Sequence, residues 1–151
     1  MKKKIAIISS ILGLVILTFL YINYNNSKKI TDISIESSDV VLQDVSIDLV
    51  QKQGNKITNL TTFDKNELNS NKNRRKTSDI TVDSDGNIIL QAKINEKHYE
   101  TILIPYVTQG NSIYSIDIQI IENEDSLFVI GEYDTLLEDH AEINSKLELK
   151  E

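Results

Sequence analysis

The sequence predicts an all-β domain behind one N-terminal transmembrane helix, and three observations support this prediction. Apolar and polar residues alternate with a period of two along much of residues 30–151. Short segments rich in Gly, Asn and Asp separate the alternating runs. Residues 5–22 form an 18-residue stretch without a charged side chain. Alternation is typical of half-buried antiparallel strands, and the uncharged stretch is long enough for a membrane helix.

The uncharged stretch, IAIISSILGLVILTFLYI, fits the hydrocarbon core of a bilayer. As a helix it extends over about 27 Å, close to the thickness of that core. The hydroxyls of Ser9, Ser10 and Thr18 can donate to backbone carbonyls one turn earlier, which lowers their cost in lipid. Residues 1–4 contain three lysines, so the positive-inside rule places the N-terminus in the cytoplasm.

Two alternatives compete with this signal anchor. A cleaved signal peptide, which would lead to secretion, has a shorter apolar region and small residues before the cut, and YINYNNS at residues 21–27 lacks that pattern. The other alternative is a helix buried in a soluble domain. We prefer residues 1–4 as a cytoplasmic basic end, 5–22 as the anchor, 23–29 as a polar stalk and 30–151 as an extracytoplasmic domain.

Charge is divided unevenly along the chain. Residues 1–29 contain five lysines and no acid, whereas residues 30–151 contain 11 basic and 23 acidic residues. The net charge of −7 therefore combines +5 with −12. A domain this acidic repels phosphate, so we expect no nucleic-acid partner. The absence of Cys excludes disulfides, thiolate metal sites and a lipidated cysteine, and it fits an exported bacterial domain.

The alternating runs predict about seven or eight strands. Their apolar residues are Ile33 and Ile35; Val45, Ile47 and Leu49; Ile88, Leu90, Ala92 and Ile94; and Ile116, Ile118 and Ile120. Turn segments at residues 53–55, 85–86, 95–96, 109–111 and 123–125 separate the runs. We expect about five strands between Ile80 and Tyr133 in an antiparallel meander. A β-sandwich, a partial barrel or a curled sheet follows.

Three local features qualify this arrangement. Residues 64–78 are polar and predict an exposed, mobile loop. The spacing of residues near 135–150 suits either a helical turn or a strand, and we favour a turn over residues 136–140 followed by a strand from Ala141. Pro105 lacks an N–H and therefore predicts an edge strand or a bulge, which is a weak indication of a partner strand.

One basic cluster interrupts the acidic domain and is the only candidate contact site. It comprises Lys72, Arg74, Arg75 and Lys76. Clustered basic side chains are attracted to anionic lipid headgroups or an anionic wall polymer. We prefer the alternative of a charged loop tip, because no aromatic residue lies among the charges.

Few other residues in the sequence suggest a metal site or a catalytic site. Residues 83–87 (DSDGN) resemble the start of a calcium loop, but the Gly comes too early and the twelfth position is Ile94, so we expect a hairpin turn and no metal. His98 is expected to face water, and His140 follows the acids Glu138 and Asp139. Neither histidine belongs to a catalytic motif, so we expect neither an enzyme nor a cofactor.

Aromatic residues on or near the expected strands leave two interpretations open. They are Tyr99, Tyr106, Tyr114, Phe128 and Tyr133. They could line a binding groove, although aromatic residues more often fill the edge of a core.

The layout resembles that of Gram-positive envelope proteins in architecture only. We expect a membrane-anchored binding or accessory component of the cell envelope, with the bilayer and an envelope protein as partners. The alternatives are a carrier or chaperone for an apolar ligand on a curled sheet and, third, a hydrolase with a dispersed site.

Overall fold

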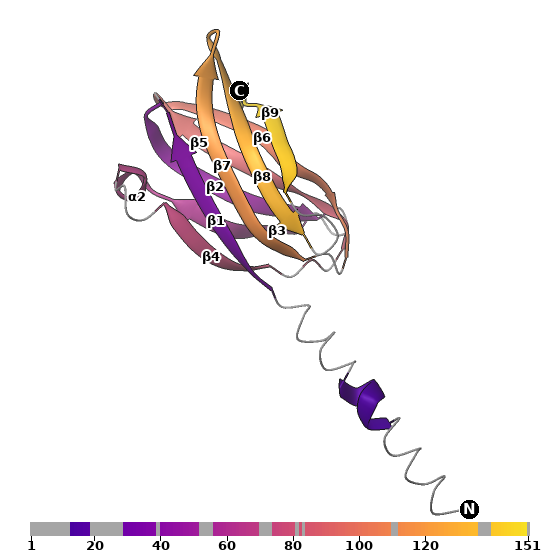
Figure 1. Cartoon of the computed structure of the whole chain (residues 1–151). Coiled ribbons are helices and arrows are strands. Elements are labelled where there is room, and N and C mark those ends of the chain that lie inside the picture. The colour runs from indigo at the N-terminus through magenta and orange to yellow at the C-terminus, as the bar shows by residue number, and fades with distance from the viewer. Residues whose placement is uncertain are drawn as a thin grey trace, which may run out of the picture.

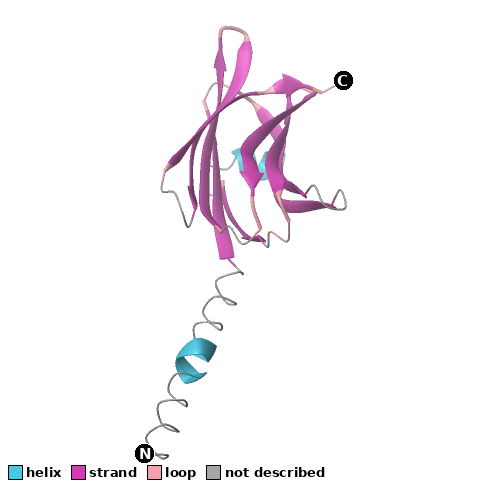
Figure 2. Cartoon of the chain, turned by 90° about the vertical axis from the view of Figure 1, so that its right-hand side faces the viewer, coloured by secondary structure: helices cyan, strands magenta, loops and turns pink. Residues whose placement is uncertain are grey.

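The structure is a computed structural model that describes residues 13–18, 29–38, 40–51, 56–69, 74–80, 82, 84–109, 112–135 and 140–150. Within these ranges the chain forms ten strands in two five-stranded sheets. The predicted all-β domain is confirmed, and of the three expected architectures the structure is a β-sandwich. Figure 2 shows the two sheets as two layers that face each other.

Each sheet mixes strands from distant parts of the chain (Figure 1). Sheet A has the order β4 (Arg75–Ile80), β1 (Lys29–Ser37), β7 (Ile113–Asn123), β8 (Ser126–Thr135) and β9 (Ala141–Lys146). Sheet B has the order β10 (Glu148–Leu149), β6 (Lys97–Val107), β5 (Gly86–Ile94), β2 (Leu42–Gln51) and β3 (Lys56–Phe63). Neighbouring strands are antiparallel, except that β1 and β7 are parallel.

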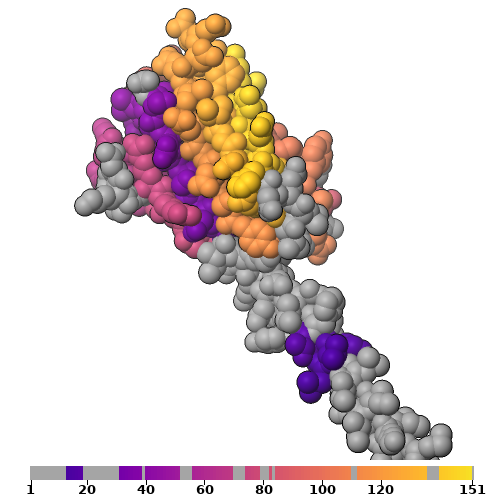
Figure 3. Space-filling view, in the orientation of Figure 1, coloured from indigo at the N-terminus to yellow at the C-terminus, as the bar shows by residue number. Residues whose placement is uncertain are grey.

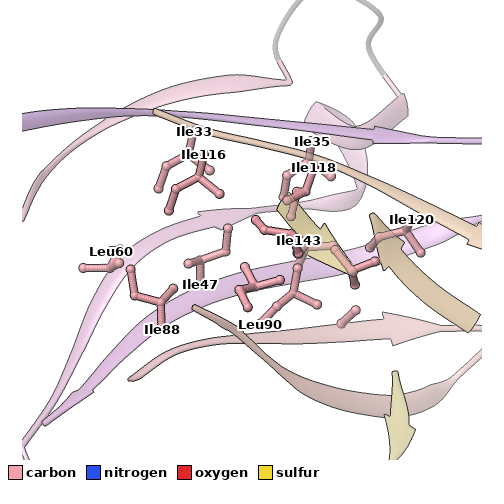
Figure 4. Close-up of a cluster of buried hydrophobic side chains, with 14 of the residues drawn as sticks. Ile33, Ile35, Ile47, Leu60, Ile88, Leu90, Ile116, Ile118, Ile120 and Ile143 are labelled. Atoms are coloured by element: carbon pink, nitrogen blue, oxygen red, sulfur yellow. The ribbon is translucent and has the colours of Figure 1, made fainter. Parts of the chain in front are cut away.

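The apolar residues of the alternating runs meet between the sheets (Figure 4). Ile33 and Ile35 of β1 and Ile118 of β7 are at most 3% exposed, as are Ile47 of β2 and Leu90 of β5. Burial of aliphatic surface is the main favourable contribution to folding. The period-two pattern therefore identified the buried face of each of these strands.

Two tight hairpins form where turn residues were expected. Asn95 and Glu96 connect β5 to β6, and Glu124 and Asp125 connect β7 to β8. All four residues have φ between 49° and 65°, as type I′ turns require. Type I′ turns match the right-handed twist of the strands that they join.

The expected meander is wrong, because the two hairpins lie in different sheets. The β5–β6 hairpin belongs to sheet B and the β7–β8 hairpin to sheet A. Each hairpin has one apolar face, and both faces are buried when the hairpins stack across the core. The structure also has more strands than the seven or eight expected, since β4 and β10 carry no alternating apolar residues in their described parts.

Two segments expected to be turns are crossovers between the sheets. Ile80, at the end of β4, is opposite Lys29, and β5 then begins in sheet B at Gly86. β6 ends in sheet B at Val107 and β7 begins in sheet A at Ile113. The hairpin expected at residues 85–86 is therefore wrong. Both crossovers lie where β1 begins, which we call the entry end.

The mobile loop expected at residues 64–78 contains regular structure. α2 (Lys65–Asn69) follows β3, and β4 begins at Arg75. Asp64 Oδ1 accepts the backbone N–H groups of Asn66 and Glu67 at 2.8 and 2.9 Å, and Glu67 Oε2 accepts that of Asp64 at 3.0 Å. This capping box, together with burial of Leu68, explains a helix in a polar segment.

The prediction of an edge strand or a bulge at Pro105 is confirmed in β6. The register of β5 with β6 shifts between Gly86 and Ile88, so that Pro105 and Tyr106 both lie opposite Asn87, and Tyr106 has φ 57°. β10 pairs only with the start of β6, so the segment that contains the proline lies at the edge of sheet B. A missing N–H is tolerated at such a bulge.

A strand begins at Ala141 as expected, but the C-terminal segment forms two strands, and each belongs to a different sheet. β9 completes sheet A, Leu147 is buried, and β10 pairs with β6 in sheet B. Residues 136–139, where a turn was expected, lie outside the described residues.

A helical turn covers residues 13–18 and lies apart from the sandwich (Figure 1). Thr18 Oγ1 donates to the carbonyl oxygen of Leu14 at 2.8 Å, as the sequence predicted for a hydroxyl in this segment. Among the residues described, no helix is long and apolar enough to cross a membrane.

Candidate functional site

The outer face of sheet A, which faces the viewer in Figure 3, carries an open hollow with several polar side chains. Because β1, β7, β8 and β9 each bury alternate residues, the intervening side chains line an open hollow of about 640 Å³. Its outward-facing residues are Ser34, Glu36, Asp117, Gln119, Ile130, Glu132, Glu142 and Asn144. The alternation could identify them from sequence, whereas their gathering depends on the strand order.

The hollow contains four carboxylates, from Glu36, Asp117, Glu132 and Glu142. The hydroxyl of Ser34 donates to the carboxylate of Asp117. Over the described ranges, no group of three or more His, Asp or Glu side chains is arranged to hold a metal ion. The surface can attract cationic groups through its field, but the described residues form no coordination site.

His140 lies beside the hollow with two carboxylates from β8. Its Nδ1 is 3.4 Å from Glu132 Oε2 and 3.5 Å from Asp134 Oδ1. Asp134 also accepts hydrogen bonds at 2.8 Å from the backbone N–H of His140 and the hydroxyl of Ser115, and these two bonds lower the pKa of its carboxyl. The acids expected beside His140 at residues 138–139 lie outside the described residues.

The hydrogen bonds among Ser115, Asp134 and His140 are not those of a nucleophilic triad. The Ser115 hydroxyl donates to Asp134, whereas a nucleophilic serine is activated by a hydrogen bond to the base. The imidazole is also 71% exposed. The arrangement therefore holds the start of β9 against β8. His98, at the start of β6, is exposed as expected.

Each described member of the basic cluster has a partner within the domain. Arg74 Nε donates to the carbonyl oxygen of Leu68 at 3.0 Å, and Arg75 forms a 3.0 Å ion pair with Asp32. Lys76 Nζ lies 2.7 Å from the carboxylate of Glu67. Lys72 lies outside the described residues. Contact with an anionic surface remains a prediction for this cluster.

The segment that resembles a calcium loop uses its described side chains locally. Asp85 Oδ1 accepts the backbone N–H of Gln109 at 3.4 Å, and Asn87 Oδ1 accepts that of Tyr106 at 3.1 Å. Both bonds join the start of β5 to the end of β6. Asp83 lies outside the described residues.

The aromatic residues do not form one stripe. Tyr99 and Tyr133 pack against the core, which agrees with the core-edge interpretation. Tyr106 is 74% exposed on β6 in sheet B, and Tyr114 is 37% exposed on β7 in sheet A. Phe128 is half-buried on the outer face of sheet A. The five side chains therefore lie on several surfaces and line no common groove.

Comparison of the chain with protein-family models, with curated proteins and with solved structures gives no match.

Proposed function

We propose that the chain is a single-pass membrane protein that holds a β-sandwich outside the cytoplasmic membrane as a binding or accessory component of a bacterial cell envelope. In this proposal residues 5–22 cross the bilayer, residues 1–4 are cytoplasmic and residues 30–151 are extracytoplasmic. The observation that carries the proposal is an exposed apolar helical turn beside a domain that has a complete core of its own.

The exposed turn is costly in water. Leu14, Val15, Ile16 and Leu17 are 69%, 58%, 52% and 67% exposed. Each apolar Å² left in water costs roughly 25 cal/mol, so four adjacent side chains of this kind favour a lipid environment. Thr18 satisfies its hydroxyl within the turn, as a transmembrane helix requires.

The described sandwich supports a binding role over the two alternatives. Its apolar residues pack together between the sheets, and the hollow on sheet A is open and lined by four carboxylates, so a carrier for apolar ligands has less support. A hydrolase also has less support, because Ser115 donates to Asp134 instead of His140. An accessory component needs an exposed, stable surface, which a sandwich provides.

Membrane fractionation of the full chain tests the anchor. We expect carbonate-resistant membrane association, and digestion of the sandwich by protease added outside wall-stripped cells. Leu14→Arg with Leu17→Arg should release the chain, since each charge costs about 2.5–3.5 kcal/mol at the centre of a membrane helix. Leu14→Ile with Leu17→Ile is the matched control and should remain in the membrane.

Two outcomes would contradict the proposal. Protection of the sandwich in wall-stripped cells would reverse the orientation, and recovery of the wild-type chain in the soluble fraction would remove the anchor. N-terminal sequencing of the mature protein distinguishes an anchor from a cleaved signal, because cleavage would remove Met1 and the apolar segment.

A further inference from the structure

An uncharged part of the chain lies at the entry end, where it passes from sheet B to sheet A. Residues 101–116 contain no charged side chain, and this is the longest uncharged run within residues 30–151. The structure describes two parts of the passage, residues 106–109 and 112–114, which we call the crossover flanks. Because the whole domain has 11 basic and 23 acidic residues, this gap in the charge sets the flanks apart from the rest of its surface.

The first flank exposes a tyrosine at a β-bulge. Pro105 and Tyr106 both lie opposite Asn87, and the Tyr106 side chain is 74% exposed. Its φ of 57° is rare for an aromatic residue, so the backbone that presents this ring is strained. Bulges commonly re-aim a side chain, and here the bulge turns an aromatic ring into solvent.

The second flank exposes another tyrosine at another bulge. The register of β7 with β8 shifts between Ile113 and Ser115, so Tyr114 is the inserted residue, and its side chain is 37% exposed. Val107 follows the first tyrosine and Ile113 precedes the second, and each of these two neighbours is 2% exposed. Both rings therefore project from backbone that is fixed in the core.

The crossover flanks lie next to the point where the chain enters the sandwich. Thr31 Oγ1, near the start of β1, donates to the carbonyl oxygen of Ile113 at 2.6 Å. In the parallel pairing of β1 with β7, Asp32 lies opposite Ser115. The chain from residue 22 to residue 29 spans at most about 25 Å when fully extended. The end of the proposed anchor is therefore always close to the flanks.

We propose that the crossover flanks contact the headgroup region of the membrane that holds the anchor, with the rings of Tyr106 and Tyr114 in the interface. The inference rests on the proposed function. Tyrosine is enriched at membrane interfaces, because its ring has an apolar body and a polar hydroxyl. The short connection to the anchor gives the flanks a high effective concentration at the bilayer, so a contact of modest area suffices.

Charge determines how the domain then stands on the membrane. Two described carboxylates adjoin the flanks: Asp85 accepts the backbone N–H of Gln109 at 3.4 Å, and Asp134 accepts the hydroxyl of Ser115 at 2.8 Å. The contact therefore depends on the two rings and not on attraction between charges. The acidic β7–β8 turn lies at the opposite end of the sandwich, where it faces away from anionic lipid.

Quenching of a fluorescent label by lipid tests the contact, and the natural sequence has no Cys to interfere. Thr108→Cys, exposed between the two tyrosines, is labelled with an environment-sensitive fluorophore. The full chain is reconstituted into phosphatidylcholine vesicles with and without lipids that carry a nitroxide on the headgroup. We expect loss of fluorescence with the nitroxide lipid. Val41→Cys is the matched control and should not be quenched, because it is 62% exposed at the opposite end. Strands of this length place it about 30 Å away.

Two further variants, made with Thr108→Cys, test the tyrosines. Tyr106→Asn with Tyr114→Ser should reduce quenching to that of the Val41→Cys control, and Asn tolerates the positive φ of the bulge. Tyr106→Asn alone should weaken quenching and leave thermal unfolding nearly unchanged, because this side chain is 74% exposed. Tyr106→Trp should retain quenching, since Trp also prefers the interface.

Equal quenching of the labels at positions 108 and 41 would overturn the proposal, as would undiminished quenching in the double variant. Quenching that requires added phosphatidylglycerol would assign the contact to basic side chains and would also overturn it. Extraction of the wild-type chain from the vesicles by carbonate would contradict the anchor instead. A chain that resists carbonate but is not quenched at position 108 keeps the anchor and loses only this inference, so the two failures are distinguishable.

Discussion

Gly131 occupies a position in β8 that no other residue suits. Its φ is +156°, and a Cβ built on it would lie 2.1 Å from the carbonyl oxygen of Asp117 and 2.9 Å from Cα of Ile118. Both contacts are with the backbone of the neighbouring strand, which cannot move without breaking the β7–β8 pairing. Gly131 is also one of the residues that line the hollow on sheet A.

Gly131→Ala should therefore lower the free energy of unfolding by about 2–4 kcal/mol, from the steric conflict and the backbone strain. Urea unfolding of the full chain in detergent, followed by circular dichroism, measures the effect. Gly13→Ala is the control, since nothing lies within 4 Å of its added Cβ. Equal stability of the two variants would mean that β7 and β8 are not paired in this register.

The helix α2 and the strand β4 are elements that polar side chains hold in place. Lys76 of β4 reaches the carboxylate of Glu67 on α2 at 2.7 Å and the carbonyl oxygen of Thr62 on β3 at 2.5 Å. Its ammonium also lies 5.1 Å from the centre of the Phe63 ring, a cation–π contact. Through Lys76, the edge strand of sheet A is connected to the edge strand of sheet B.

The pH dependence of stability should reveal this connection. The hydrogen bond from Lys76, and then the backbone N–H of Asp64, lower the pKa of the Glu67 carboxyl. Such a carboxylate contributes stability above its unfolded pKa of about 4.3, and the contribution is lost as the pH falls through the lower folded value. Glu67→Gln should therefore reduce the urea midpoint at neutral pH and have little effect well below pH 4.

Unfolding curves at several pH values between neutral and acid measure this difference. Glu142→Gln, at an exposed carboxylate on β9, is the control for the loss of one negative charge. A constant difference between wild type and Glu67→Gln at all pH values would contradict the stabilising contact with Lys76.

At the scale of the molecule, the C-terminal segment joins the two sheets. Leu147 lies between β9 and β10, is 3% exposed, and its N–H donates to the carbonyl oxygen of Leu127 at 2.8 Å. Ser145 donates to the carbonyl oxygen of Ile102 at 3.0 Å, and Lys150 forms a 2.5 Å ion pair with Glu100. These contacts cover the first part of β6, up to Ile102, and not the segment around Pro105 that the sequence suggested as a place for a partner strand.

Leu147→Ala should destabilise the sandwich by about 2–4 kcal/mol, because it removes a buried side chain where the sheets meet. Leu149→Ala, two residues later at a position 55% exposed, should change stability by less than about 0.5 kcal/mol. Thermal melts of the two variants provide the comparison. Similar losses would show that β10 contributes through its general hydrophobicity, not through burial of Leu147.

The sequence by itself determined the class of the domain, the buried face of its clearest strands and the turns at residues 95–96 and 123–125. Alternation at Ile33 and Ile35 or at Ile116–Ile120 reports which side chains must leave water, and Asn95–Glu96 lies between two such runs. These properties depend on residues adjacent in the chain. They are visible without knowledge of what each strand pairs with.

Only the tertiary structure decided which strands are neighbours. The parallel pairing of β1 with β7 joins residues about 80 positions apart, and the two hairpins stack across the core instead of lying in one meander. A period of two specifies a buried face but not the sheet that covers it. For the same reason, the hollow on sheet A, which combines side chains from four strands, emerges only after the strands are placed.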